Sequence, residues 1–428
     1  MSAKTADETE HPMGGEEQQR EAAASLIGWI LEAALQQGPI QSLLAELCVR
    51  IRAQGLPLIR GSIGLNTLHP SIGSRSYAWW HNRDSVAMDF PREGGNGPGF
   101  EESPFARMLY SSTPTLRRRL ESEEEIAEFP IFRDLHAAGG TGYYAMATAF
   151  GLAPNDLSQA NGMVSSWLTD RPGGFADGHI QTLTDLMPAL ALAVQAAKNA
   201  EIARNIATTY LGADAGGRVL AGQITVGGAH SLTAVLVFTD LRGFTAIADR
   251  IPRDETVRVL NAYFKPMVEP ISRHGGQVLK FMGDGLLAIF PLDDTASAET
   301  VCGSALTAME EMRREVHALN QTRAAAGEPV MELDTSVHLG EVQYGNVGSA
   351  DRMDFTVIGP AVNEASRIEG MCRALDRDIL ISNVFADACG RHRARLLPLG
   401  RYGLRGVKAP QALFTLYGEA ADSNNRSP

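Results

Sequence analysis

Two aspartates stand where the sequence predicts tightly constrained backbone. Asp240 ends an apolar run in VFTDLRGFT, and Asp284 follows 44 residues later in KFMGDGLLAIF. A strand end and a hairpin turn can bring both carboxylates to one edge of a sheet, although each alone also fits a helix N-cap or a turn residue. At about 4 Å two carboxylates repel by roughly 4 kcal/mol at an effective dielectric near 20, so the pair needs a cation or a shared proton. Oxygen ligands of this kind favour Mg²⁺ or Mn²⁺, and two such ions assist phosphoryl or nucleotidyl transfer.

Two further groups could bind phosphate. The segment from Leu241 to Thr245 includes Phe244 and begins a helix, where free backbone N–H groups can cradle an anion. Downstream, Asn363 and Arg367 are four residues apart on a predicted helix and so share a face. An amide can hold a ribose oxygen while a guanidinium stabilises phosphate charge in a transition state. The alternative is an exposed helix on which the arginine pairs with a neighbouring glutamate.

These motifs together resemble one family. FTDLRGFT, KFMGDG and GNVGSADRMDFTVIGPAVNEASR lie within residues 231–418 in the order and spacing of the catalytic domain of class III nucleotidyl cyclases. The resemblance implies a homodimer with two active sites at its interface. It also implies that Asp240, Leu241 and Asp284 of one chain hold two Mg²⁺ or Mn²⁺ ions, while the other chain supplies the residues that bind base and phosphate.

The resemblance also assigns base recognition, to Lys280 and Thr356. Adenylate-specific members have Lys at the first position, where guanylate-specific members have Glu, and one subgroup of adenylate cyclases has Thr at the second. A Lys ammonium can donate to N1 of adenine and a Thr hydroxyl can accept from the 6-amino group, whereas guanine would need an acceptor in place of Lys. The Lys–Thr combination resembles the bicarbonate-responsive branch, so bicarbonate activation is a hypothesis from that likeness. Otherwise, Lys280 is a solvated strand residue.

The activity implied is adenylate cyclase: conversion of ATP to 3′,5′-cyclic AMP and pyrophosphate. Asn363 would orient the ribose, Arg367 would stabilise the transition state, and Phe244 and Thr245 would contact the substrate. In RYGLRGVK, Arg405 or Lys408 would contact the triphosphate, with RGVK in place of the family's usual KGK. Glu364 is a second departure, because the family more commonly has a small or apolar residue there. The alternatives are a guanylate cyclase, which Lys280 opposes, and a catalytically silent module that binds nucleotide.

The elements that must position these residues indicate an α+β fold with two domains. The predicted catalytic domain, residues 223–418, is of the βαββαβ type. Before it, residues 23–185 predict two helices, an antiparallel sheet and a closing helix, a layout similar to a GAF-type sensor of an unknown small molecule. Residues 186–222 predict a signalling helix that ends in a Gly/Ala-rich hinge, and disordered tails are expected at 1–22 and 419–428.

Aromatic residues in the first domain could line a ligand pocket, but alternating aromatic positions in strands are usually core. They are Trp79, Trp80, Tyr143, Tyr144 and Trp167. No CxxCH motif or close His/Cys pair accompanies Cys48, His69 or His81, so the sequence does not favour a haem or metal site there.

Composition limits the remaining possibilities. The 428 residues include 38 Lys+Arg against 50 Asp+Glu, a net charge of −12, which argues against charge-driven binding to nucleic acid or anionic lipid. Four dispersed cysteines suggest neither a disulfide framework nor a zinc site. With no apolar run long enough for a membrane span and no export signal in the sequence, a cytoplasmic protein is expected.

Overall fold

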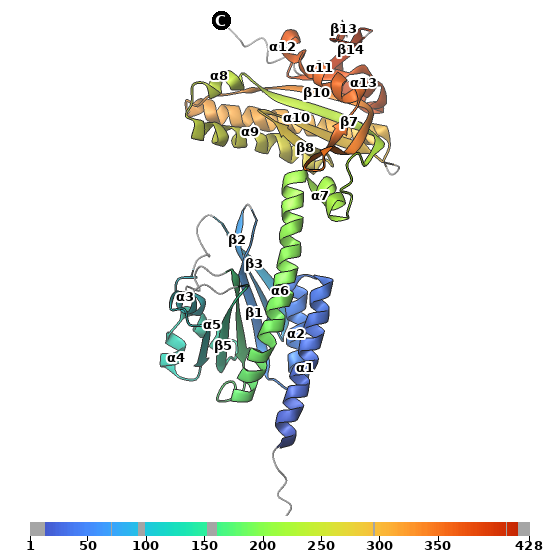
Figure 1. Cartoon of the computed structure of the whole chain (residues 1–428). Helices are drawn as coiled ribbons and strands as arrows, with labels where there is room; N and C mark the ends of the chain where they lie inside the picture. The colour runs from blue at the N-terminus through green and yellow to red at the C-terminus, as the bar shows by residue number, and fades with distance from the viewer. Residues whose placement is uncertain are drawn as a thin grey trace, which may run out of the picture. The chain divides into compact units, whose positions relative to one another are not determined.

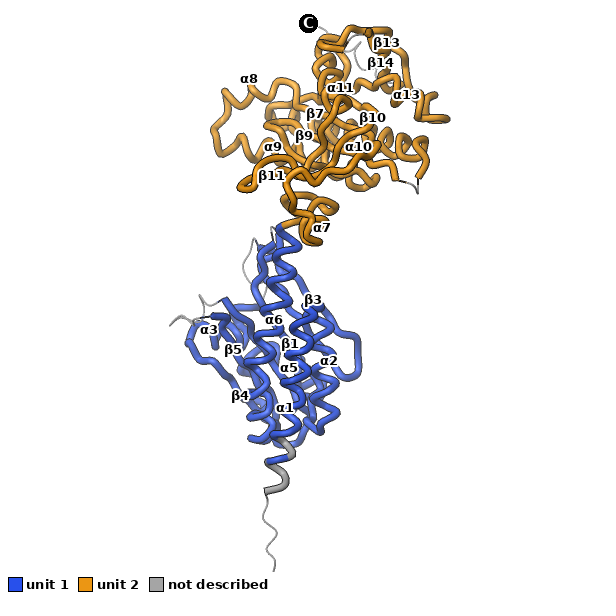
Figure 2. Tube along the Cα trace, turned by 45° about the vertical axis from the view of Figure 1, so that its right-hand side comes forward, with its two compact units in different colours: residues 1–206 blue, residues 207–428 orange. Residues whose placement is uncertain are grey.

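The computed structural model of the chain describes residues 13–69, 71–92, 99–151, 161–293, 296–407 and 409–417. Two compact units divide between Ile206 and Ala207, a boundary that falls within the helix α6 (Asp177–Leu211) (Figure 2). No helix within the described ranges is long and apolar enough to cross a membrane. The mixture of helices and sheets confirms the predicted α+β class.

The N-terminal unit is built on a six-stranded antiparallel sheet with the order β3-β2-β1-β6-β5-β4. Its strands are β1 (Leu58–Asn66), β2 (Ile72–Trp80), β3 (Arg83–Pro91), β4 (Thr115–Arg119), β5 (Gly142–Ala149) and β6 (Gly162–Thr169). The sequence predicted this sheet because short β-branched and aromatic segments alternate with Gly/Pro clusters. The likeness to a GAF domain stays a prediction.

Helices cover both faces of this sheet (Figure 1). One face packs against α1 (Met13–Gln36), α2 (Ile40–Ala53) and α6, and the other against α3 (Pro104–Tyr110), α4 (Glu123–Ala127) and α5 (Pro130–Ala137). Most of the predicted aromatic residues are core: Trp79, Tyr143, Tyr144 and Trp167 are buried, whereas Trp80 is partly exposed.

Two sequence-based expectations need correction in this part of the chain. Residues 13–22, assigned to a disordered tail, belong to α1, because Met13 already begins the helix. Residues 211–222, expected to form a Gly/Ala-rich hinge, contain the helix α7 (Ala213–Leu220), in which Arg218 pairs with Asp214 one turn earlier. Composition alone does not reveal such an i,i+4 pair. Residues 1–12 and the predicted tail at 419–428 lie outside the described residues.

The C-terminal unit contains a sheet with the order β13-β14-β12-β10-β7-β9-β8, and β11 pairs with β10. The strands are β7 (Ala229–Arg242), β8 (Gln277–Met282), β9 (Gly285–Leu292), β10 (Glu332–Ser349), β11 (Arg352–Ile358), β12 (Ile379–Ser382), β13 (Leu396–Tyr402) and β14 (Gln411–Leu416). The central β7 is antiparallel to β9 and β10, and β12 runs parallel to β10.

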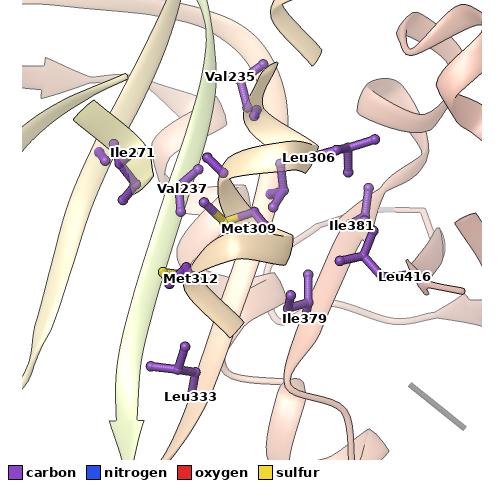
Figure 3. Packing of buried hydrophobic residues seen from close by; sticks show 14 of the residues in the cluster. Val235, Val237, Ile271, Leu306, Met309, Met312, Leu333, Ile379, Ile381 and Leu416 are labelled. Carbon is purple, nitrogen blue, oxygen red and sulfur yellow. The ribbon is translucent and has the colours of Figure 1, made fainter. Parts of the chain in front are cut away.

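A large apolar core holds the central strands in place. Val235 and Val237 of β7 pack against α9 (Arg253–Arg273) and α10 (Ala298–Ala325), and Figure 3 shows Met309 and Met312 of α10 reaching between the strands. The alternate residues of β7 face a second core formed with α7 and α11 (Pro360–Glu369). With both faces buried, the register of β7 is tightly specified, and so is the position of Asp240 near its end.

The remaining helices are short: α8 (Phe244–Ala248), α12 (Cys372–Leu375) and α13 (Asn383–Ala388), with a 3₁₀ segment at Gly390–Arg395. The predicted helix over 361–374 ends at Glu369, and the chain resumes helical structure only at Cys372. This early end places Glu369 in the last turn of α11.

Candidate active site

The β8–β9 hairpin brings Asp284 to the end of β7. Met282 pairs with Gly285, so Gly283 and Asp284 form a two-residue turn, and Gly283 takes a positive φ of 68° as primed hairpin turns require. A Cβ on Gly285 would lie 2.6 Å from the carbonyl oxygen of Thr239 and 2.9 Å from Oδ1 of Asp240. Only glycine permits this approach, which is how the GDG sequence sets Asp284 beside Asp240.

The charges of these two carboxylates are close enough to act on each other. Burial, followed by the negative charge of Asp284, raises the pKa of Asp240 to about 6. Asp334 lies directly opposite Asp240 in the β7–β10 register, but its charge is offset by Arg242, whose Nε donates to Oδ1 of Asp334 at 2.9 Å. Arg242 is therefore engaged, and the Asp240–Asp284 pair retains uncompensated negative charge.

Glu369 is a further acidic group at this site, and sequence reasoning missed it. Burial, then the charges of Asp240 and Asp334, raise its pKa to about 7, and Asp284 adds to the effect. No local motif signals this role, because Glu369 reaches the carboxylates only through the packing of α11 on the sheet, where Ser336 Oγ donates to the carbonyl oxygen of Ala365 at 2.7 Å.

The donor set fits a divalent cation held jointly with a substrate. Within the described ranges, no group of three or more His, Cys, Asp or Glu side chains could hold a metal ion alone. Mg²⁺ is commonly bound through one or two carboxylates, with water and substrate phosphates completing its shell. Asp240 and Asp284 provide the two carboxylates, and the buried Leu241 follows directly on the strand. A divalent cation bound between the two carboxylates would offset their mutual repulsion.

The predicted phosphate cradle begins at the next residues. Gly243 takes a positive φ of 86° and caps the short helix α8, so the chain turns sharply after β7. Phe244 packs partly against the main core, and Thr245 is exposed. The first N–H groups of any helix lack intrahelical acceptors, so those of Phe244 and Thr245 lie near the carboxylate pair without a helical partner.

Asn363 and Arg367 share an exposed face of α11, as predicted. The guanidinium of Arg367 lies against Gly406, where an added Cβ would be 3.3 Å from its Nη2. Arg405 precedes Gly406 in that loop and is exposed, so it adjoins the residue that Arg367 lies against. Lys408 lies outside the described residues.

Lys280 and Thr356 come from elements that contact each other, β8 and β11. Lys280 is partly buried and follows an irregularity in the β8–β9 pairing after Val278. Thr356 is only 4% exposed, and its buried Oγ1 finds no hydrogen-bond partner in the described part of the chain. A buried hydroxyl without a partner is unusual in a folded protein, so this atom is suited to bind something outside the chain.

Glu364 points to the other flank of α11. Its Oε2 lies 3.8 Å from Nε2 of His338, and both residues line a pocket of about 420 Å³ together with Glu341 and Gln343. Burial lowers the pKa of His338 to about 4, so the imidazole is neutral at pH 7. The negative charge of Glu364 is thus directed toward a different surface from that of Asn363 and Arg367.

Comparison with known proteins finds similarity in this part of the chain. Residues 229–418 match the family model for the adenylate and guanylate cyclase catalytic domain. The chain is 30% identical over 184 residues to adenylate cyclase 1 of Rhizobium meliloti, covering 42% of this chain and 27% of that protein. It is 36% identical over 164 residues to the adenylate cyclase of Anabaena cylindrica, covering 37% of this chain and 31% of that one.

Among solved structures, the chain is similar to the adenylyl cyclase CyaB from P. aeruginosa, with 26% identity and a TM-score of 0.40 over 44% of this chain and 95% of that one. The chain spans about a third or less of the length of the two curated relatives named above. The family model matches within the C-terminal unit, and that match supports a nucleotide cyclase domain there.

Proposed function

We propose that the C-terminal unit is an adenylate cyclase that forms cyclic AMP and pyrophosphate from ATP. The observation that carries this proposal is the Asp240–Asp284 pair, in which burial and mutual repulsion raise the pKa of Asp240 to about 6 at the end of β7. The family match of residues 229–418 supports it. When bound there, Mg²⁺ or Mn²⁺ supplies charge that favours ionisation of the ribose 3′-hydroxyl and loss of pyrophosphate.

In the reaction, the ribose 3′-oxygen forms a bond to the α-phosphorus, and the bond from that phosphorus to the bridging oxygen of the β-phosphate breaks. The 3′-hydroxyl proton passes to water and the electron pair leaves with pyrophosphate. Asp240 and Asp284 would hold the divalent cation against which the reacting phosphate binds. Asn363 positions the ribose, while Arg367 and Arg405 bind the phosphate oxygens on which charge accumulates.

Two chains would complete one site in this proposal. The guanidinium of Arg367 lies against Gly406, and within the described residues it forms no ion pair with Asp240 or Asp284. A homodimer in which Asp240 and Asp284 of one protomer face Asn363 and Arg367 of its partner would join them. A mixture of Asp284→Ala and Asn363→Ala chains should then regain activity, since a mixed dimer has one intact site. Demonstrated mixed dimers without any activity would contradict the shared site.

Base preference follows from Lys280 and Thr356. The unpartnered Oγ1 of Thr356 can accept from the 6-amino group of adenine, and the Lys280 ammonium can donate to N1. We expect ATP to be preferred over GTP when both compete in one turnover assay. Lys280→Glu should reduce kcat/KM for ATP by at least about tenfold, because a buried donor and acceptor no longer match. Preferential turnover of GTP by the unaltered protein would favour a guanylate cyclase instead, and no turnover of either would favour a silent module.

The N-terminal unit would regulate this activity as a sensor of a small molecule, since the unit boundary falls inside the continuous helix α6. Activation by bicarbonate remains a prediction from the Lys–Thr combination. Measuring cyclic AMP formation by the full chain with and without bicarbonate, at constant pH and ionic strength, tests that prediction directly.

A further inference from the structure

A small cavity lies at the end of the β2–β3 hairpin in the N-terminal unit. Its volume is about 250 Å³, and it is lined by Ile59, Trp80, His81, Asn82, Arg83 and Ala138. Ile59 and Trp80 belong to the side of the sheet that packs against α3, α4 and α5. Pockets for drug-sized ligands are typically about 300–1,000 Å³, so this cavity suits a smaller molecule.

Two guanidinium groups converge on the indole of Trp80. The Cζ atom of Arg83 lies 3.7 Å from the ring centroid, and that of Arg60 lies 5.5 Å from it. In the described part of the chain, neither arginine forms an ion pair with a carboxylate. Arg107, by contrast, also lies over an aromatic ring, that of Phe129 at 5.6 Å, but pairs with Glu128 at 2.5 Å. Two unneutralised cations at one ring are unexpected in a chain with a net charge of −12.

Neutral groups hold Arg60 in place without offsetting its charge. Its Nη1 donates to the hydroxyls of Ser62 at 3.1 Å and Ser166 at 3.0 Å, and these two hydroxyls are 2.7 Å apart. Both serines are almost fully buried. Burial lowers the pKa of Arg60, Tyr143 opposes that effect, and the nearby charge of Arg83 adds to it. A cation that is even partly buried is costly unless it is paired, so an anion bound beside Arg60 would stabilise the unit.

The chemistry of the lining agrees with an anionic ligand. Arg83 is exposed and offers a planar, forked set of donors that matches the oxygens of a carboxylate or phosphate. Asn82 and His81 add polar groups from the same turn, and the indole of Trp80 provides an apolar wall. We propose that this cavity binds a small metabolite anion through its carboxylate or phosphate oxygens, with Arg83 as the main contact and Arg60 as a second positive charge beside Trp80.

The test uses the full chain and two probes, inorganic phosphate and succinate, followed by calorimetry and by tryptophan fluorescence at constant ionic strength. Saturable binding of at least one probe, with a change in fluorescence, is expected. Arg83→Gln should weaken that binding about tenfold or more, the effect of losing a charge-assisted hydrogen bond. Arg107→Gln is the matched control, an arginine over a ring in the same unit whose charge is already paired, and it should bind as the unaltered chain does.

Trp80→Phe should abolish the fluorescence change while calorimetry still detects binding, which locates the ligand at this ring. The two probes distinguish the two kinds of ligand. Tighter binding of phosphate indicates a ligand with phosphate oxygens, and tighter binding of succinate indicates one with carboxylate oxygens. Binding of neither probe up to millimolar concentrations overturns the proposal, as does equal weakening by Arg83→Gln and Arg107→Gln. None of these readouts depends on cyclase turnover, so the outcome is independent of the function proposed for the C-terminal unit.

Discussion

Each unit of this protein contains a small cluster of like charges, and the two clusters differ in how they are held. Asp240 near the end of β7 lies close to Asp284, which belongs to the two-residue turn between β8 and β9. At the end of the β2–β3 hairpin, Arg60 and Arg83 converge on Trp80. The carboxylates repel strongly because their charge is localised on a few oxygens. Each guanidinium delocalises its charge over its own planar group and is stabilised by contact with the indole ring, and for Arg60 also by two hydroxyls, so the two coexist at lower cost.

That difference predicts how the clusters respond to change. A bound cation would be the main factor that stabilises the acidic pair. Removing either carboxylate should therefore abolish the reaction that the cation assists. The basic pair is already partly accommodated by Trp80, Ser62 and Ser166, so its loss should weaken anion binding but change stability only slightly. The predictions that follow test this contrast.

The largest effect is expected from removing either carboxylate. Asp240→Ala or Asp284→Ala should reduce cyclic AMP formation by at least ~1,000-fold with Mn²⁺ or Mg²⁺ present, because the remaining side chain cannot hold the cation against the phosphates. Turnover of purified protein measures this. Asp249→Ala, at an exposed position after α8, is the control and should leave activity unchanged. Normal turnover in either variant of the pair would refute the metal assignment.

Gly285→Ala should disrupt the acidic site by forcing β9 away from the end of β7. The new Cβ would lie 2.6 Å from the carbonyl oxygen of Thr239, so β9 must move away from β7 at a cost of about 1–3 kcal/mol in unfolding free energy. Both the urea midpoint and the activity should fall. Gly217→Ala is the matched change, since nothing lies within 4 Å of its Cβ position in α7, and it should be neutral or stabilising. Equal effects of the two changes would contradict the close approach.

Asp240→Asn should stabilise the metal-free protein. The pKa of Asp240 is raised from 3.8 to about 6, so the folded state resists ionisation and loses stability as pH rises through that interval. The variant lacks this loss, and its advantage should grow from pH 4 to 6 and then level off. Because the carboxyl is only half-buried, we expect on the order of 1 kcal/mol. Thermal midpoints across pH measure it. Added Mn²⁺ should raise the midpoint of the unaltered chain only, and the opposite pH trend would be inconsistent with repulsion.

The smallest effect is expected at the basic cluster. Arg83→Gln should raise the thermal midpoint of the ligand-free chain slightly, because one of two neighbouring cations is removed. The gain in unfolding free energy should be about a few tenths of a kcal/mol. The gain should shrink as salt screens the repulsion. Arg107→Gln should lower the midpoint instead, since it breaks the pair with Glu128. If both variants lower the midpoint equally, Arg83 is not in a repulsive cluster.

Local patterns were sufficient to predict much of this molecule. The apolar run before Asp240 predicted β7, the GDG sequence predicted the hairpin turn, and the spacing of Asn363 and Arg367 predicted their shared face on α11. Each depends on interactions between residues close in sequence, which is why composition and spacing carry them. Short β-branched and aromatic segments between Gly/Pro clusters likewise predicted an antiparallel sheet in the first unit, and the structure shows it with six strands.

The sequence by itself determined most of the strands and long helices, and it supplied the chemistry of Asp240, Asp284 and Arg367. Tertiary structure alone decided that Glu369 joins the acidic site, and that Arg60 and Arg83 meet at Trp80. These groups are distant in the chain or carry no motif, and they meet only after strands pair in register and helices pack on them. The helix α7 in a Gly/Ala-rich segment has the same origin, because Tyr344 donates to Asp214 at 2.9 Å across the fold. Such contacts depend on packing, and packing is a property of the whole unit.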